Sequence, residues 1–485
     1  MSAVALSSAP RFTWPWALAA LAAWAVMLAT MARLPDTGVA VLAVEAAGLF
    51  LLMRALAPAR HRAAVDAIFA VALLAYTLEV LALQSLPAWS DAFPDSTRYD
   101  RNARALVLHW QGQAVPTADY LLKGLRFLGV AEWPPGDAYD YTQALGMSRY
   151  LYQLLLAGIY ALTDGSRTTA VFANVPFLAA AAGGTYLLAY SLFGGTVARL
   201  AAALVVLDTN FAVWGSVLLR ESLLLFLVVL AFLSTVRLLK GEGRTAANLA
   251  LGSGALGLLT LVRFNAVAAL LLAGFAALPA RMWRPAIRRL VPALAGLALL
   301  GFLLARAFPG LAPALENSLP GQVAVENLNV LRSGELVLNA ATGSDAGREV
   351  HVNAVRQEWH TALREQPLWL NGLKALTRSL MGPYPWVALT RGLSGENFYE
   401  LMYPGMALWL LFLPAFLYAL WRLPFRDEPA LRLCVAWLAL VALIYIVGYG
   451  QLGGRERMMA QPLLWILAAE GARRLWRRGV AEAPA

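Results

Sequence analysis

Residues 221–237 read ESLLLFLVVLAFLSTVR, an apolar run with charged residues only at its two ends. A helix of roughly 17 to 25 such residues is long enough to cross the hydrocarbon layer of a bilayer. Further long apolar runs fall at 14–32, 37–56, 63–84, 147–163, 169–191, 195–213, 246–262, 264–280, 290–307, 402–421, 433–450 and 459–475. The runs are continuous rather than alternating, which argues against a β-barrel. The sequence therefore predicts an all-α polytopic membrane protein.

Composition supports this class. The chain has 485 residues, of which 60% are hydrophobic and only 14% are charged, whereas soluble domains carry about 25% charged residues. The net charge of +10 comes mainly from short arginine clusters between apolar runs, a pattern typical of topology signals rather than of nucleic-acid binding. A single cysteine, Cys434, permits no intramolecular disulfide and no thiolate metal cluster.

The arginine clusters also predict which side of the membrane each connection occupies. Basic residues follow the runs that end near positions 56, 237, 280 and 421, and they end the chain. All of these clusters lie in the cytoplasm only if 147–163 does not cross the membrane, because positive loops stay inside. We therefore expect 147–163 to be an amphipathic helix on the outer surface, about twelve spans, and both termini in the cytoplasm. The Ala- and Arg-rich composition indicates a bacterial chain, and hence an inner-membrane location.

This layout divides the chain into four parts and leaves two outer-face loop regions carrying amphipathic surface helices. The parts are 1–62 with two N-terminal spans, 63–308 with the membrane bundle and a first outer loop at 86–168, 309–401 with the second outer loop, and 402–485 with the last spans and a basic tail. Arginines at the outer ends of spans oppose the tendency of positive charge to lie in the cytoplasm, so they need an explanation.

Several charged residues gather at these outer ends. Asp95 stands in the first outer loop and could act as a general base or a metal ligand. Each charge also has an ordinary explanation, such as a solvated loop, a helix dipole, snorkelling or contact with lipid headgroups. The candidate residues are Asp95 and Glu221 for catalysis, and Tyr99, Arg220, Arg263, Arg378, Arg455 and Arg457 for substrate binding. Guanidinium groups are suited to binding phosphate, so together these residues indicate a phosphorylated lipid substrate.

Short motifs support the same interpretation. Asp95-Ser96 is followed by Tyr99 and Ala103, and an Arg-Glu pair stands at 220–221. The other motifs are the segments 150–162 and 174–194, the Gly-Pro-Tyr-Pro-Trp sequence at 382–386, and Arg455-Glu456-Arg457 followed by Pro462.

On these residues the chain resembles the C-type glycosyltransferase superfamily, which includes protein mannosyltransferases and the aminoarabinose transferase of lipid A. The resemblance covers most of residues 63–475 and implies a polyprenyl-phosphate-linked sugar as donor. It implies that Asp95 is the base that accepts the proton of the acceptor, while the outer arginines stabilise the leaving lipid phosphate. The acceptor, whether lipid, glycan or protein, is left open.

Other interpretations remain open. The family's second acid is replaced by Ser96, which weakens a two-carboxylate metal site, so a divalent cation stays an open question and no other cofactor is indicated. An oligosaccharide polymerase or ligase would use a polyprenyl-pyrophosphate substrate with similar arginine-rich loops. A lipid-linked-sugar transporter would carry charged residues inside the bundle, deep in the membrane. An ATP-driven pump is not expected, because the Gly-rich phosphate-binding loop is missing from the sequence.

Overall fold

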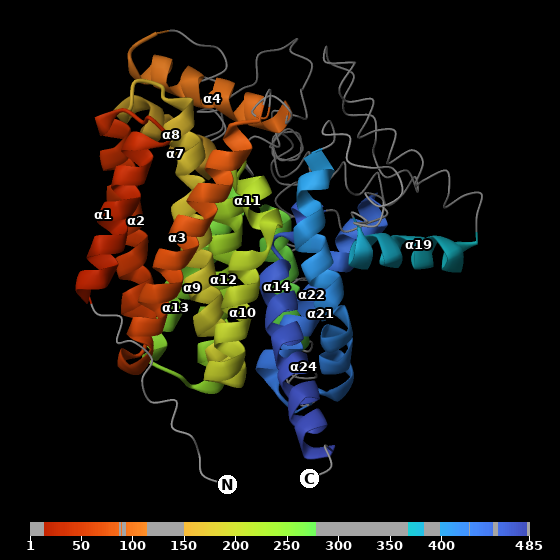
Figure 1. The fold of residues 1–485 in the computed structure, drawn as a ribbon. Helices are drawn as coiled ribbons and strands as arrows, with labels where there is room; N and C mark the ends of the chain where they lie inside the picture. The colour runs from red at the N-terminus through yellow and green to blue at the C-terminus, as the bar shows by residue number, and fades with distance from the viewer. Residues whose placement is uncertain are drawn as a thin grey trace, which may run out of the picture.

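The computed structural model describes residues 14–86, 89, 94–113, 150–277, 367–382, 398–425, 427–449 and 454–482. All regular elements in these ranges are helices, and no strand occurs among them. Most of the helices stand side by side in an upright bundle, and α4 lies across one end of it (Figure 1). The predicted all-α fold is therefore confirmed for the described part of the chain.

Most of the helices follow the apolar runs, while α4, α19 and α23 lie outside them. The N-terminal half contains α1 (Trp14–Thr30), α2 (Asp36–Leu56), η1 (Ala59–His61), α3 (Arg62–Gln84), α4 (Pro94–Trp110), α7 (Tyr150–Leu162), α8 (Arg167–Phe172), α9 (Asn174–Phe193), α10 (Gly195–Leu207) and α11 (Thr209–Gly215). The remainder contains α12 (Glu221–Lys240), α13 (Thr245–Val262), α14 (Phe264–Ala277), α19 (Leu368–Met381), η5 (Phe398–Met402), α21 (Tyr403–Arg422), α22 (Pro429–Tyr449), α23 (Gly454–Arg457) and α24 (Gln461–Glu482).

Seven helical segments among the described residues are long and apolar enough to cross a membrane, or eight if α10 and α11 form one span bent by 50°. The chain is thus a multi-pass membrane protein, although the expected twelve spans are not confirmed. The runs at 14–32 and 264–280 give the shorter helices α1 and α14. The run at 459–475 gives α24, which carries Glu470 near its middle and several arginines in its second half. The run at 290–307 lies outside the described residues.

Helix α9 is the centre of the bundle. The most apolar stretch of the segment Arg167–Phe193, which contains α9, is completely buried. Helix α9 packs against α12, α10 and α3. Small residues make this close packing possible: a Cβ atom added to Gly184 would lie 2.6 Å from Cγ1 of Val229 on α12. Small residues at helix contacts are typical of membrane bundles, where van der Waals packing replaces the hydrophobic effect between helices.

The first predicted outer loop holds two of the described helices. Helix α4 begins at Pro94 and packs against α7. Helix α7 has 13 residues, so it is about 20 Å long, shorter than the roughly 30 Å of hydrocarbon in a bilayer. This length agrees with a helix that does not cross, while its position on the outer surface stays a prediction.

The second predicted outer loop is described only in part, through α19 and η5. Helix α19 extends sideways from the bundle at a steep angle to α22 (Figure 1). Its Trp369 is 71% exposed, whereas Asn371, Ala375 and Ser379 are buried along one helix face. Amphipathic surface helices were expected in this loop region, and the described helix Leu368–Met381 has that character.

Candidate functional site

Two carboxylates that the sequence places in different regions both stand in the first turn of a helix. Asp95 is in the first turn of α4, and Glu221 is the first residue of α12. Negative charge is favourable at a helix N-terminus, because the free backbone N–H groups and the helix dipole stabilise it. Helix α23 brings Arg455 to the same place from the C-terminal part of the chain.

Arg455 joins the two carboxylates. Its Nη1 donates to Oδ2 of Asp95 at 2.6 Å, and its Nε donates to Oε1 of Glu221 at 2.5 Å. Burial alone would lower the pKa of the Arg455 guanidinium, but the charges of Glu221 and Asp95 outweigh burial and raise that pKa well above its usual value. Arg455 therefore stays charged and links α4, α12 and α23 through one side chain.

Asp95 has a second guanidinium beside it. Nη2 of Arg98, one helical turn further along α4, donates to Oδ1 of Asp95 at 2.8 Å. Both oxygens of this carboxylate thus accept hydrogen bonds from arginine, while its side chain keeps 29% of its surface exposed. Glu221 is only 1% exposed. The two acids therefore differ in access, and Asp95 is the one that a ligand can reach.

Arg220 and Arg263 complete the charge distribution around Glu221. The charges of Arg455, Arg220 and Arg263 all act on the Glu221 carboxylate. Arg220 is 5% exposed, and its Nη1 donates to the carbonyl oxygen of Val262 at 2.5 Å. This contact ties the start of α12 to the end of α13. Three arginines around one buried acid give this part of the site an excess of positive charge.

Arg263 caps the end of α13. Its guanidinium carbon lies 5.3 Å from the centre of the Tyr445 ring, and its buried Nη1 has no hydrogen-bond partner among the described residues. Burial acts to lower the pKa of Arg263, but Tyr445, Glu456 and Glu221 together raise it. A buried donor without a partner is costly, so this nitrogen is available to an acceptor from a ligand.

We name Asp95, Arg98, Arg220, Glu221, Arg263 and Arg455 the Arg455 cluster. Sequence reasoning selected five of its six members and missed Arg98. The signal for Arg98 was its spacing, since residues three apart on a helix face each other, and α4 was expected to be a loop.

Tyr99, a predicted substrate contact, is completely buried. Its ring packs edge-on against Tyr152 of α7, with the ring centres 5.4 Å apart. Ser96 of the same helix accepts a hydrogen bond at its Oγ from the backbone N–H of Leu218, 3.1 Å away. These contacts hold the first turn of α4 against α7 and the segment before α12, so Tyr99 positions Asp95 through packing.

Arg457 and Arg378 contact no member of the Arg455 cluster in the described hydrogen bonds and ion pairs. Arg457 is 3% exposed and points to α21 and α24, where its Nε donates to Oε1 of Gln461 at 2.8 Å. Its guanidinium also lies over the ring of Trp409, 4.6 Å from the ring centre. Arg378 is exposed on α19, a helix that packs on α22.

The described residues contain no group of three or more His, Cys, Asp or Glu side chains that could hold a metal ion. Asp95 and Glu221 are the two carboxylates close enough to share a ligand here, and a guanidinium occupies the position between them. A divalent cation shared by these two acids would have to displace Arg455.

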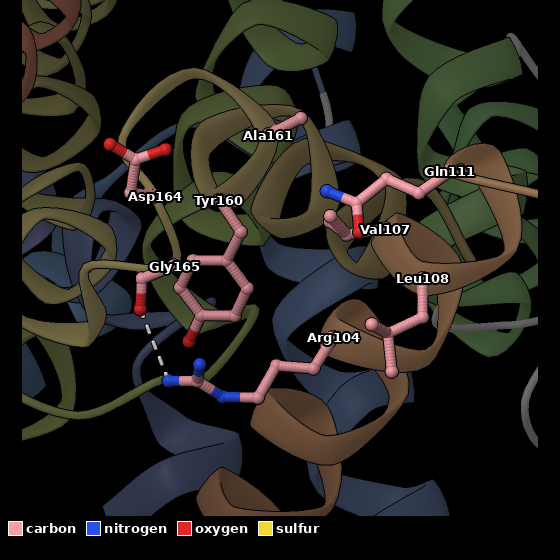
Figure 2. Close-up of a pocket in the computed structure, with 8 residues that line it drawn as sticks. All are labelled: Arg104, Val107, Leu108, Gln111, Tyr160, Ala161, Asp164 and Gly165. Carbon is pink, nitrogen blue, oxygen red and sulfur yellow. Dashed lines mark hydrogen bonds between the residues drawn. The ribbon is translucent and has the colours of Figure 1, made fainter. Parts of the chain in front are cut away.

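A groove of about 450 Å³ lies further along α4, against the end of α7 (Figure 2). Arg104 reaches across it, and its Nη2 donates to the carbonyl oxygen of Gly165 at 3.1 Å. Asp100 pairs with Arg104 and also accepts a hydrogen bond from the Tyr160 hydroxyl. Burial and that hydrogen bond raise the pKa of Tyr160. The groove is separate from the Arg455 cluster, and its polar groups mainly satisfy one another.

No family model, curated protein or solved structure matches the chain.

Proposed function

We propose that the protein is a membrane glycosyltransferase that moves a sugar from a polyprenyl-phosphate donor to an acceptor on the non-cytoplasmic face. The observation that carries this proposal is the bridge from Arg455 to Asp95 and Glu221. It places an accessible carboxylate beside several guanidinium groups at one end of a membrane bundle. The sequence motif Asp95-Ser96 with Tyr99 supports the same assignment.

In the proposed reaction an oxygen of the acceptor hydroxyl attacks the anomeric carbon of the sugar. The bond between that carbon and the phosphate oxygen breaks, and its electron pair leaves with the lipid phosphate. Asp95 accepts the proton of the hydroxyl, which requires that it release one of its arginine contacts. General-base catalysis of this kind contributes about 10²- to 10⁴-fold in other enzymes.

The arginines stabilise the negative charge that develops on the phosphate. Arg455 exchanges Asp95 for a phosphate oxygen, while Glu221 keeps its hold on the other side of the guanidinium. Arg263 contributes the donor Nη1, which has no partner among the described residues. The hydrogen bond that Arg455 withdraws from Asp95 is thus given to the leaving phosphate.

The test is a comparison of donors with the purified protein in lipid vesicles. A radiolabelled monosaccharide on a polyprenyl monophosphate should be consumed, with release of polyprenyl phosphate. Turnover only of an oligosaccharide on a polyprenyl pyrophosphate would support the polymerase or ligase alternative and reject the proposal. A substitution of Arg263 to Met should raise KM for the monophosphate donor, because it removes a phosphate contact.

A transporter is the second candidate, because one observation favours it. Asp208 is completely buried at the break between α10 and α11, and buried carboxylates at broken helices form ion and substrate sites in transporters. Movement of an intact labelled lipid-linked sugar across sealed vesicles, with no transfer to any acceptor, would select this candidate.

The orientation in the membrane belongs to the proposal as well. We propose a bacterial inner membrane with both termini in the cytoplasm, supported by the arginine clusters and by Figure 1, in which the C-terminal end of α24 lies at the opposite end of the bundle from α4. A C-terminal tag should be cleaved by protease only from inside-out vesicles. Cleavage in right-side-out vesicles would place the site on the cytoplasmic face.

A further inference from the structure

A second cluster of polar side chains lies where the bent pair α10–α11 meets α24. Asp208 stands at the break and is completely buried. Its Oδ1 accepts from the backbone N–H and from Nδ2 of Asn210, at 3.1 Å and 2.6 Å, and its Oδ2 accepts from Nε1 of Trp465 at 2.9 Å. The carboxylate is thus satisfied by neutral donors from α11 and α24.

Arg457 lies beside this cluster without forming an ion pair there. Among the described residues it contacts the amide oxygen of Gln461, the Sδ atom of Met406 at 3.4 Å and the ring of Trp409. Its Nη2 has no hydrogen-bond partner among the described residues. Burial lowers the pKa of Arg457 to about 10, against the opposing effect of Asp208. Thioether sulfur is a weak acceptor, so this buried cation is incompletely compensated.

Such a side chain is a poor choice for stability, since an apolar residue of similar length would pack without a desolvation cost. What Arg457 does provide is a fixed direction for α23. That helix has only four residues, and its two arginines leave it in different directions, Arg455 toward Asp95 and Glu221 and Arg457 toward α21 and α24. The position of one guanidinium therefore depends on the anchorage of the other.

Gly454, the first residue of α23, lies against η5. A Cβ atom at this position would lie 2.4 Å from Cε of Met402, the end of a flexible side chain that can move aside. The contact of Arg457 with the Trp409 ring is therefore the more rigid of the two. The direction of the short helix, and with it the reach of Arg455 to both carboxylates, depends mainly on Arg457.

We propose that Arg457 is a positioning residue for the Arg455 cluster: it fixes α23 so that Arg455 spans Asp95 and Glu221. The expected effect of Arg457 on turnover rests on the proposed function, whereas its expected effect on the position of α23 does not. The sequence-based expectation for Arg457, contact with the substrate phosphate, is the alternative that the test below distinguishes. A residue that acts in this way should affect turnover more than donor affinity.

The test compares Arg457→Gln and Arg457→Lys with the full-length protein in lipid nanodiscs. The first readout is hydrogen–deuterium exchange of peptides that cover residues 94–99 and 217–222. Arg457→Gln should speed exchange in both segments at least threefold, and Arg457→Lys should restore most of the protection. Trp24→Phe is the control, because it removes a buried hydrogen bond to Thr77 that joins α1 to α3 and should leave both segments unchanged.

The second readout is turnover with the polyprenyl-monophosphate donor. Arg457→Gln should lower kcat at least tenfold with KM within about twofold, and Arg457→Lys should recover part of kcat. If Arg457→Gln fails to fold, Arg457→Met supplies the same test, because it also removes the guanidinium while an apolar side chain of similar length packs in its place.

The outcomes separate the two proposals. Unchanged exchange in 94–99 and 217–222, or equal effects of Arg457→Gln and Trp24→Phe, would overturn the positioning role. A rise in KM with kcat unchanged would instead make Arg457 a donor contact. Altered exchange in a protein whose wild type transfers no sugar would uphold the positioning role and reject the proposed function.

Discussion

Replacing Arg455 by Met would leave Glu221 buried without its closest counter-charge. Removing one partner of a buried ion pair destabilises a protein by about 3–5 kcal/mol. Glu221 is 1% exposed, but the charges of Arg220 and Arg263 still act on it. We therefore expect Arg455→Met to lower the free energy of unfolding by about 2–3 kcal/mol, at or below the lower end of that range. The bond to the more exposed Asp95 adds little, because partly exposed ion pairs contribute about 0–1 kcal/mol.

The assay is thermal unfolding of the purified protein in one detergent, followed by tryptophan fluorescence. Arg455→Met should lower the unfolding midpoint by several degrees, and the double variant Arg455→Met with Glu221→Gln should regain at least half of that loss, because no uncompensated acid remains. A midpoint equal to wild type for Arg455→Met would refute the bridge. Simple additivity of the two single variants would show that Arg455 and Glu221 do not interact.

Further predictions concern packing and a second buried ion pair. Gly471→Ala should destabilise strongly, by about 3 kcal/mol or more, because its Cβ would lie 1.8 Å from the carbonyl oxygen of Ala415. Gly257→Ala, with no neighbouring atom within 4 Å, should be neutral or slightly stabilising in the same melt, and equal effects of the two would contradict the packing of α24 on α21. Arg54→Met should lower the free energy of unfolding by about 2–4 kcal/mol, because it leaves the buried Asp66 without its ion-pair partner. An unfolding midpoint unchanged from wild type would show that the pair does not form.

Most of the helices could be predicted from hydropathy alone. The run 402–421 gave a helix at Tyr403–Arg422, and the run 221–237 gave one at Glu221–Lys240. The count of spans was harder, because hydropathy does not distinguish a short apolar helix such as α14 from a complete crossing. Hydropathy also treated 195–213 as one uniform run. The structure bends this segment at Asp208, whose side chain accepts from the backbone N–H of Asn210 and caps the new helix α11.

The meeting of Asp95, Glu221 and Arg455 followed from charge topology, since residues predicted on one side of a membrane at helix ends are confined to a thin layer. The directions of individual side chains did not follow. Arg455 and Arg457 are two residues apart, and only the packing of α23 shows that they point to different partners. The packing of the Tyr99 ring against Tyr152 likewise could not be predicted, because it depends on how α4 lies against α7.

The most direct test of the central claim is the rate of sugar transfer by Asp95→Asn, measured beside Asp100→Asn on the same helix. Asp100 pairs with Arg104 and Tyr160, so its variant controls for the loss of a carboxylate on α4. Wild type and Asp100→Asn should consume a polyprenyl-monophosphate sugar at comparable rates, whereas Asp95→Asn, folded and inserted normally, should be slower by about 10²-fold or more. Transfer by Asp95→Asn at the wild-type rate would exclude Asp95 as the general base.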